Sequence, residues 1–203
     1  MVAARDADVV VLAAGRSSRL GQPKGLVAVR GRPWLEHQLE ALAGTGVGVR
    51  RVVLVLGFDR EAYLAALPGV ASMAVPVVNG APERGPFSSL QCGLAEVVRD
   101  GDRPAFVLPV DVPVAAPDVW EALAGALGPG IDAVVPVHGK GGHPVLLSST
   151  LVRHLLTLPP EGPESRLDLQ LRLVSVARVP VADARVGLNL NVAEDWGKLE
   201  GGG

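Results

Sequence analysis

The regular alternation of two kinds of segment is the feature that most limits how this chain can fold. Short apolar runs rich in valine and leucine alternate with amphipathic stretches over most of the 203 residues. This order predicts parallel strands joined by right-handed helical crossovers. Aromatic residues make up only 3% of the chain, so aliphatic side chains must fill the core, which is typical of a sheet covered on both faces. We therefore expect an α/β fold, a three-layer α/β/α sandwich around a mostly parallel, Rossmann-like sheet, in a single domain over residues 1–200 with a disordered tail at 201–203.

Proline, aspartate and serine mark where several of the expected helices begin. Pro33 stands at the start of one helix, Asp59 is expected to cap a short helix, and Ser88 and Ser89 are expected to cap another. After Val137 the pattern becomes less regular. The expected strands cover residues 8–12, 51–56, 73–78, 105–110, 131–137 and 145–147, and the expected helices cover 34–42, 88–98, 117–127, 149–157 and a last short stretch around residues 195–196.

The segment Leu12–Lys24 directly follows the first expected strand and has the composition of an anion-binding loop. Small residues at its start let a polyanion approach the backbone N–H groups, and two arginines and Lys24 supply positive charge. These properties predict a triphosphate site, with an ordinary solvated loop as the alternative. The second and third glycines of the dinucleotide fingerprint are missing, and no Gly-Lys-Ser/Thr sequence opens a helix here, so neither a dinucleotide site nor a P-loop is predicted.

Two further polar segments follow expected strands. The stretch Asn79–Pro86 comes after the strand over 73–78, and Asp111 comes after the strand over 105–110. Ligands of open parallel sheets bind at the carboxyl ends of the strands. The opening loop and these two segments are therefore expected to meet at one edge of the sheet.

Charge and cysteine content exclude several classes of protein. A net charge of −2 argues against a general nucleic-acid or membrane-surface binder, so an anion site must be local. No apolar run reaches membrane-spanning length and the first residues lack a signal-peptide core, which favours a cytoplasmic protein. The single cysteine, Cys92, excludes an internal disulfide, and its place in an expected helix favours a packing role over a nucleophilic one.

Several motifs together resemble the MobA-like nucleotidyltransferases, the group that includes molybdenum cofactor cytidylyl- and guanylyltransferases and related sugar-phosphate enzymes. The first motif is specific, because Leu-Ala-Ala-Gly-x-Ser-x-Arg-hydrophobic-Gly-x-x-Lys occurs in order. The resemblance extends from Val9 to about Lys198 and implies a fold like that of the nucleotide-diphospho-sugar transferases. The other segments that carry it are Gly31–Leu35, Ser88–Leu94, Asp111–Pro113, Gly142–Leu146 and Asn189–Trp196.

The resemblance implies transfer of a nucleoside monophosphate from a nucleoside triphosphate to a phosphorylated small molecule, with release of pyrophosphate. At position 14, guanylyltransferases typically have glycine, and Ala14 resembles the cytidylyl branch instead. CTP is therefore the expected nucleotide and molybdopterin the expected acceptor. A sugar phosphate is the competing acceptor, and Pro86-Phe87 departs from the more usual Gly-Met of the cytidylyltransferases. A partner enzyme that receives the product is a further expectation. The alternative from another functional class is an inactive nucleotide-binding regulator with the same fold.

The resemblance also implies roles for individual residues. Asp111 and Asn191 are expected to hold Mg²⁺, and Asn189 either supports Asn191 or pairs with backbone. Lys24 is expected to neutralise the α-phosphate and Arg19 to bind the β- and γ-phosphates. Gly142 and His143 are assigned to the acceptor site, Lys24, Arg19 and Asp111 to catalysis, and the nucleotide site comprises Leu12, Ala13, Ala14, Gly15, Arg16, Ser17, Ser18, Arg19, Lys24, Asn79, Ser88, Ser89 and Gly93.

Overall fold

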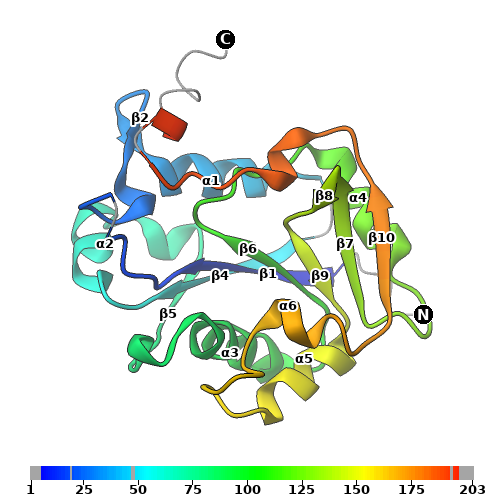
Figure 1. The fold of residues 1–203 in the computed structure, drawn as a ribbon. Coiled ribbons are helices and arrows are strands. Elements are labelled where there is room, and N and C mark those ends of the chain that lie inside the picture. Colours follow the sequence, from blue (N-terminus) through cyan, green and yellow to red (C-terminus); the bar gives the residue numbers. More distant parts are fainter. Residues whose placement is uncertain (1–5, 19, 47–48, 193, 197–203) are drawn as a thin grey trace.

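The computed structural model describes residues 6–18, 20–46, 49–192 and 194–196, so Arg19 and the tail at 201–203 lie outside the described residues. One eight-stranded sheet crosses the molecule in the order β10-β7-β9-β6-β1-β4-β5, with β8 paired to β7 (Figure 1). The parallel pairs are β1 with β4, β1 with β6, β4 with β5, and β7 with β10. The strands are β1 (Ala7–Ala13), β4 (Val49–Leu56), β5 (Val75–Val78), β6 (Ala105–Pro109), β7 (Ala133–His138), β8 (Lys140–Gly141), β9 (Val145–Leu147) and β10 (Val176–Pro180).

Helices cover both faces of this sheet (Figure 1). The face with α1, α2 and α4 contains Val9, Val11 and Leu54, whereas the face with α3 and α5 contains Val10 and Val55. Strand residues alternate between the faces, so both sides of each central strand must be apolar. The helices are α1 (Trp34–Ala43), α2 (Arg60–Ala66), α3 (Pro86–Val97), α4 (Pro117–Ala126), α5 (Ser149–Thr157) and α6 (Leu167–Gln170), and a small hairpin joins β2 (Ala28–Val29) to β3 (Arg32–Pro33).

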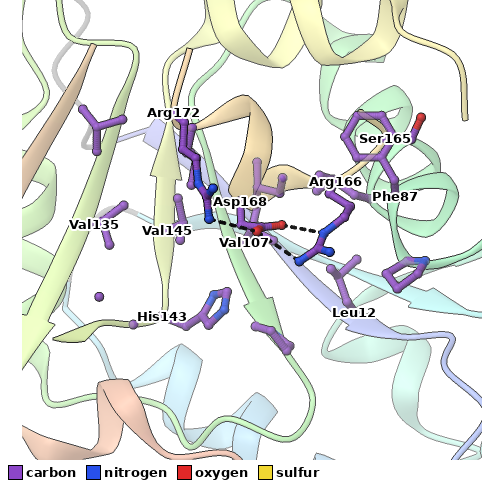
Figure 2. A pocket seen from close by; sticks show the side chains of 18 of the residues that line it. Leu12, Phe87, Val107, Val135, His143, Val145, Ser165, Arg166, Asp168 and Arg172 are labelled. Atoms are coloured by element: carbon purple, nitrogen blue, oxygen red, sulfur yellow. Dashed lines mark hydrogen bonds and ion pairs between the residues drawn. The ribbon is translucent and has the colours of Figure 1, made fainter. Parts of the chain in front are cut away.

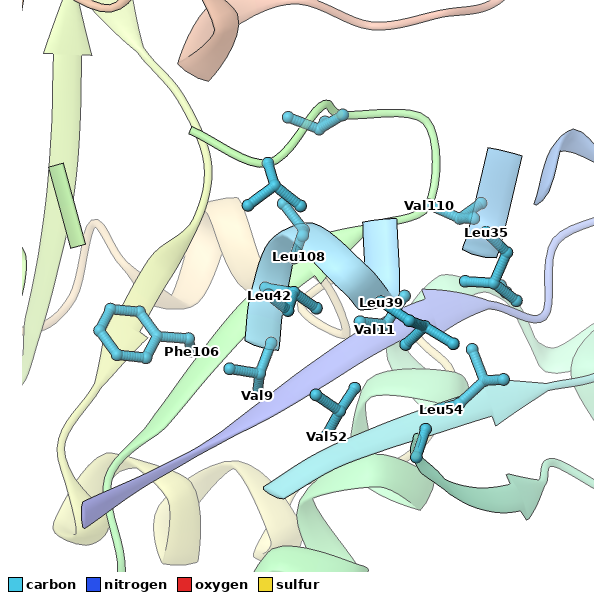
Figure 3. Close-up of a cluster of buried hydrophobic side chains, with 14 of the residues drawn as sticks. Val9, Val11, Leu35, Leu39, Leu42, Val52, Leu54, Phe106, Leu108 and Val110 are labelled. Atoms are coloured by element: carbon cyan, nitrogen blue, oxygen red, sulfur yellow. The ribbon is translucent and has the colours of Figure 1, made fainter. Parts of the chain in front are cut away.

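The predicted three-layer, mostly parallel α/β fold is confirmed. On one face, the α1 side chains Leu35, Leu39 and Leu42 are almost completely buried. Figure 3 shows them beside the strand residues Val9 and Val11. Burial of this apolar surface is the main contribution that holds the layers together.

Two helix starts differ from the prediction. Helix α3 begins at Pro86, with Gly85 at its N-cap in a left-handed conformation (φ = 100°), so Ser88 and Ser89 lie in the first turn and do not cap it. Proline is favoured at the first position of a helix because its missing N–H has no partner there in any case. Asp59 does precede α2, but its side chain makes no capping hydrogen bond.

The second half of the sheet differs from the prediction, although the strand expected over residues 145–147 occurs as β9. Strand β9 pairs antiparallel with both β6 and β7, because the turn between β7 and β9 is too short for a helical crossover. Within that turn, β8 pairs with β7. Helix α6 and the edge strand β10 were not predicted, since both follow the proline-rich break and β10 shows no strong alternation of burial.

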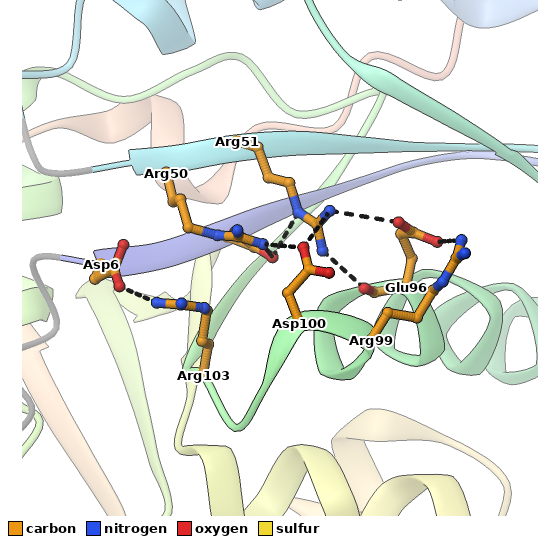
Figure 4. Close-up of polar contacts among 8 residues, drawn as sticks. Asp6, Arg50, Arg51, Glu96, Arg99, Asp100 and Arg103 are labelled. Atoms are coloured by element: carbon orange, nitrogen blue, oxygen red, sulfur yellow. Dashed lines mark hydrogen bonds and ion pairs between the residues drawn. The ribbon is translucent and has the colours of Figure 1, made fainter.

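A network of ion pairs lies at the amino end of β1, opposite the carboxyl edge. The Asp8 side chain is completely buried, and its two oxygens accept hydrogen bonds from Arg50 Nε and Arg51 Nε, both at 3.0 Å. Arg51 also donates to the carbonyl of Glu96, 2.8 Å away (Figure 4). A buried carboxylate needs such partners, so this network joins β1, β4 and α3 structurally. Among the described residues, no helix is both long enough and apolar enough to cross a membrane.

Candidate functional site

The loops that follow β1, β5 and β6 meet at the carboxyl edge of the sheet, as predicted, around a cavity of about 440 Å³. The loop after β4 also borders this cavity, through Phe58. Ala13, Ala14 and Gly15 form its wall on the β1 side, and Asp111 lies on the β6 side. The β4 loop packs tightly here, because a side chain at Gly57 would come within 2.6 Å of the Ala14 carbonyl oxygen. The Phe58 N–H donates to the same carbonyl, so this contact holds the opening loop against the β4 loop.

Ser17 shapes the opening loop. Its hydroxyl accepts a hydrogen bond from the Lys24 backbone N–H at 3.1 Å, and its carbonyl accepts from the N–H groups of Leu20 and Gly21. These bonds fold the loop back on itself, so that Lys24 is brought close to the end of β1. Ser17 lines the cavity, whereas Ser18 is exposed and does not.

Lys24 connects the two predicted metal ligands. Its Nζ donates to Asp111 Oδ2 at 2.6 Å and to Asn191 Oδ1 at 2.8 Å. The side chains of Lys24 and Asp111 are about four-fifths buried, so this contact is shielded from water more than a surface ion pair would be. Lys24, Asp111 and Asn191, which the resemblance assigned to catalysis or to metal binding, therefore form one cluster.

Backbone contacts hold Asn191 beside Asp111. The N–H of Leu190 donates to the Asp111 carbonyl at 2.8 Å, and Asp195 Oδ2 accepts from the N–H groups of Asn191 and Val192. The Asn191 amide nitrogen lies 3.3 Å from the Asn189 carbonyl oxygen, so Asn189 supports Asn191 through its backbone.

A buried tyrosine holds the backbone next to Lys24 in place. The Tyr63 hydroxyl accepts a hydrogen bond from the Gly25 N–H at 2.9 Å. Burial raises the pKa of Tyr63 to about 12, so the hydroxyl stays protonated near neutral pH. A side chain at Gly25 would lie 2.7 Å from the Tyr63 ring, which explains why a glycine follows the lysine. The sequence analysis did not predict a role for Tyr63, because it looks like an ordinary residue of a short helix.

The donor set suits a small hard cation. Asp111 offers a carboxylate and Asn191 an amide oxygen, and both oxygens already face a positive charge, the Lys24 ammonium. Mg²⁺ prefers oxygen ligands and commonly keeps waters and substrate phosphates in its shell, so two protein oxygens are sufficient. Among the described residues, no group of three or more His, Cys, Asp or Glu side chains forms a metal site made entirely of protein. The residues therefore fit a metal that is shared with a bound nucleotide.

The other residues predicted for the nucleotide site separate into two sets. Ser89 lines the cavity, whereas Asn79 and Ser88 do not. The Asn79 amide donates to both serine hydroxyls, at 2.9 and 3.0 Å, and Ser88 donates to the Gly85 carbonyl. This network holds the start of α3 against the end of β5, so Asn79 and Ser88 support the wall and do not form it.

Gly93 has a packing role in the structure. It lines neither of the two cavities described here, and a side chain at this position would lie 2.4 Å from Val10 Cγ1. Glycine at this point lets α3 approach the sheet closely. Its assignment to the nucleotide site therefore has no support from the geometry.

Arg16 stands at the mouth of the smaller cavity. Its guanidinium lies 4.4 Å from the centre of the Phe58 ring, in a cation–π arrangement. Phe58 lines the same cavity and was not predicted. The predicted phosphate contact of Arg19 lies outside the described residues.

A second cavity of about 820 Å³ adjoins the first and shares Leu12, Pro86 and Pro109 with it. Gly142 and His143, which the resemblance assigned to the acceptor site, both line it, and Figure 2 shows the His143 side chain. A side chain at Gly142 would lie 2.1 Å from the Val186 carbonyl oxygen, and that oxygen accepts the His143 N–H at 2.8 Å. Burial lowers the pKa of His143, so its ring is neutral near pH 7.

Arginines that were not predicted also line the larger cavity. Arg166 and Arg172 border α6, Arg178 lies on β10, and Asp168 stands between the first two. Their elements follow the proline-rich break, after which no function was assigned. The available signal was the recurrence of arginine at positions 166, 172 and 178 in a stretch whose only acidic residue is Asp168.

Comparisons with known proteins find relatives among the nucleotidyltransferases. The sequence profile described as the MobA-like NTP transferase domain matches residues 9–174. A probable molybdenum cofactor guanylyltransferase of Bacillus cereus is 27% identical over 195 residues, which are 92% of each chain. The 2-C-methyl-D-erythritol 4-phosphate cytidylyltransferase of Cereibacter sphaeroides is 34% identical over 145 residues, which are 67% of this chain and 63% of that protein.

Solved structures show the same architecture. The crystal structure of Rv0371c from Mycobacterium tuberculosis H37Rv superposes with a TM-score of 0.77 at 28% identity, covering 96% of this chain and 97% of that one. A structure of Rv0371c in complex with manganese superposes with a TM-score of 0.72 at 26% identity, covering 96% and 98% of the two chains.

Proposed function

Because this chain belongs to the MobA-like NTP transferase family, we propose that it transfers a nucleoside monophosphate from a nucleoside triphosphate to a phosphorylated small molecule and releases pyrophosphate. One observation carries this proposal. Lys24 Nζ joins Asp111 and Asn191 beside a loop of small residues at the carboxyl edge of the sheet. This arrangement places positive charge and metal-binding oxygens where a triphosphate would lie.

The transfer needs positioning and charge neutralisation more than a strong base. A phosphate oxygen of the acceptor attacks the α-phosphorus of the nucleotide, and the bond from that phosphorus to the oxygen bridging the β-phosphorus breaks. A phosphate monoester is largely ionised near neutral pH, so no residue has to remove a proton from it. Lys24 and the N–H groups of the opening loop stabilise the charge that develops at the α-phosphate.

Asp111 and Asn191 would hold a divalent cation, for which Mg²⁺ is the expected ion. When bound, the metal would neutralise charge on the α-phosphate and the leaving pyrophosphate. The manganese complex of Rv0371c supports a divalent ion in a protein of the same fold. The Lys24 ammonium contacts the same two oxygens, so with a cation bound there it would be available to contact the phosphates instead.

We propose CTP as the nucleotide, on the basis of Ala14. This residue lines the smaller cavity, is 3% exposed and has its methyl group packed against Gly57 of the β4 loop. An alanine at this position resembles the cytidylyl branch of the family. GTP is the second candidate, because the Bacillus cereus relative is a probable guanylyltransferase that matches nearly the whole chain. The cytidylyltransferase of Cereibacter sphaeroides supports CTP over a shorter match.

We propose molybdopterin as the acceptor, with a partner enzyme that takes up the product. The Bacillus cereus relative supports this assignment. A sugar phosphate is the alternative acceptor, since the Cereibacter sphaeroides relative acts on an erythritol phosphate. Gly142 and His143 would contact the acceptor in the larger cavity.

Calorimetric titration with CTP, GTP, UTP and ATP, each with and without Mg²⁺, tests the nucleotide half of the proposal. Mg²⁺-dependent binding of one triphosphate, together with pyrophosphate release when the acceptor is added, would support it. Binding without pyrophosphate release, and unchanged affinity in Asp111→Ala, would instead favour a nucleotide-binding regulator. Absence of binding to all four nucleotides would overturn the transferase proposal.

A further inference from the structure

A buried tryptophan at the start of α1 contacts the chain beside Lys24 and beside Asp111. The Trp34 indole Nε1 donates a hydrogen bond to the Val110 carbonyl at 2.8 Å, and Val110 immediately precedes Asp111. The Trp34 backbone N–H donates to the Val27 carbonyl at 2.9 Å, shortly after Lys24. Trp34 is 7% exposed, so water competes little for either bond.

The Trp34 ring also contacts the segment that carries the second candidate metal ligand. It packs edge-on against the Trp196 ring, with the centroids 5.5 Å apart and an angle of 82° between the planes. This edge-to-face arrangement is a favoured one for aromatic pairs. Trp196 follows Asp195, whose carboxylate accepts the backbone N–H of Asn191 at 2.9 Å. Trp34 is therefore linked by a specific contact to the segment of each candidate metal ligand.

Gln38, one helical turn after Trp34, holds the other side of Asp111. Its amide Nε2 donates to the Val112 carbonyl at 2.7 Å, and the residue is 1% exposed. Residues four apart in a helix lie on the same face, so α1 directs both donors at the segment after β6. The Asp111 carbonyl itself accepts the Leu190 N–H. Three consecutive carbonyls, with that of Asp111 in the middle, are thus each bound by a separate donor.

We propose that Trp34 and Gln38 are positioning residues, which hold the Asp111 carboxylate where a divalent cation can bind it. This inference rests on the proposed function and adds to it two residues that line neither of the two cavities described here. A carboxylate that is already held in place loses little conformational freedom when the cation binds, so the affinity for the cation is higher.

Packing alone explains Gln38 less well than this role does. Its Oε1 is buried and has no hydrogen-bond partner among the described residues. Burial of an unpaired amide oxygen is unfavourable, and an aliphatic side chain would avoid it but would leave the Val112 carbonyl without a partner. The amide is therefore explained by the carbonyl that it holds. Trp34 belongs to Gly31–Leu35, a segment that carried the family resemblance without an assigned role.

Titration of the full chain with Mn²⁺ alone, followed by electron paramagnetic resonance, tests the inference. Trp34→Phe and Gln38→Leu keep an apolar side chain at each buried position and remove the hydrogen-bond donor. Each should weaken Mn²⁺ binding about fivefold, as expected for the loss of one hydrogen bond, and leave the number of binding sites unchanged. A misfolded fraction would instead lower the number of sites, and the remaining sites would keep their affinity.

Two matched controls remove the same kinds of hydrogen bond elsewhere in the fold. Trp120→Phe removes an indole N–H that donates to a backbone carbonyl at 3.2 Å, and Gln91→Leu removes an amide that donates to two carbonyls at 2.8 Å. None of these carbonyls belongs to a residue next to Lys24, Asp111 or Asn191, so both controls should bind Mn²⁺ with unchanged affinity. Unchanged affinity in the two α1 variants, or an equal loss in the controls, would overturn the inference.

Asp111→Ala and backbone hydrogen exchange separate this inference from the proposed function. If Asp111→Ala abolishes Mn²⁺ binding while Trp34→Phe and Gln38→Leu bind normally, the positioning role fails and the metal site stands. If the unmodified protein and Asp111→Ala bind Mn²⁺ equally, or not at all, the metal site fails and hydrogen exchange decides the positioning role. The N–H groups of Val110 and Val112 are hydrogen-bonded and should exchange faster in the two α1 variants than in the controls. Equal exchange would overturn the positioning role.

Discussion

Lys24 Nζ lies 2.6 Å from Asp111 Oδ2, although 87 residues separate the two along the chain. The ammonium thus occupies the position in which a cation would contact this carboxylate. Because the same nitrogen also contacts Asn191, one lysine links the opening loop to both oxygens of the candidate metal site. The predictions that follow test this cluster and its supports.

Lys24→Ala should reduce turnover by on the order of 10²-fold or more, since it removes charge that stabilises the transition state. Steady-state pyrophosphate release, with the nucleotide and acceptor that binding studies identify, measures the effect. Lys140→Ala is the control, because Lys140 is exposed and lines neither cavity. Turnover equal to that of the unmodified protein would remove Lys24 from the mechanism.

Asn191→Asp should strengthen divalent-cation binding by about tenfold, because a second carboxylate replaces a neutral amide oxygen in the site. Titration with Mn²⁺, followed by electron paramagnetic resonance, measures the affinity directly. Asn189→Asp adds the same charge two residues away, where only the backbone carbonyl supports Asn191. Equal gains in the two variants would show that general charge, and not ligation by residue 191, is responsible.

Gly93→Ala should destabilise the protein by about 1–3 kcal/mol, because the new methyl group would lie 2.4 Å from Val10 Cγ1 and overpack the α3 contact. Urea unfolding measures this loss. Gly125→Ala makes the same change in α4, where a methyl group meets open space, and it should stabilise by about 0.5–1 kcal/mol. If Gly93→Ala lowers nucleotide affinity without lowering stability, Gly93 belongs to the nucleotide site after all.

The stability of the protein should fall as the pH drops below the ordinary histidine pKa of 6.5, in part through His143. Burial lowers the pKa of this ring in the folded state, so the unfolded chain binds the proton more readily. The neutral ring carries no penalty above pH 6.5, and the cost of burying a charged ring appears below it. Urea unfolding at pH 8 and pH 5.5 should therefore show a smaller loss for His143→Gln than for the unmodified protein. The exposed His138→Gln should retain the full pH dependence, and an identical loss in all three proteins would contradict the prediction.

Local sequence patterns were sufficient for the main strands and helices of the first half of the fold. The strand around Val9–Leu12, the helix that begins at Trp34 and the aspartate after β6 all occur as predicted. Each depends on residues close together in sequence, namely an apolar run, an amphipathic period or a polar residue at a strand end. The loop of small residues beside a nucleotide-sized cavity was predictable for the same reason.

Helix α6, strand β10 and the arginines of the larger cavity required the tertiary structure. The strand Val176–Pro180 lies at the edge of the sheet and is only partly buried, so it lacks the continuous apolar run that identifies a central strand. Ser88 likewise resembled a helix cap in sequence, whereas contacts with Asn79 give it a supporting role.

The sequence by itself determined the alternating α/β layers, the anion-binding composition of the opening loop and the placement of Asp111 at a strand end, because these properties depend on neighbouring residues. Only the tertiary structure decided that Lys24 contacts Asn191, 167 residues away, and that Gly93 packs against the sheet. Such contacts depend on the order of strands and on how closely the layers pack. Those quantities arise from the burial of the whole core, and no short segment of the chain contains them.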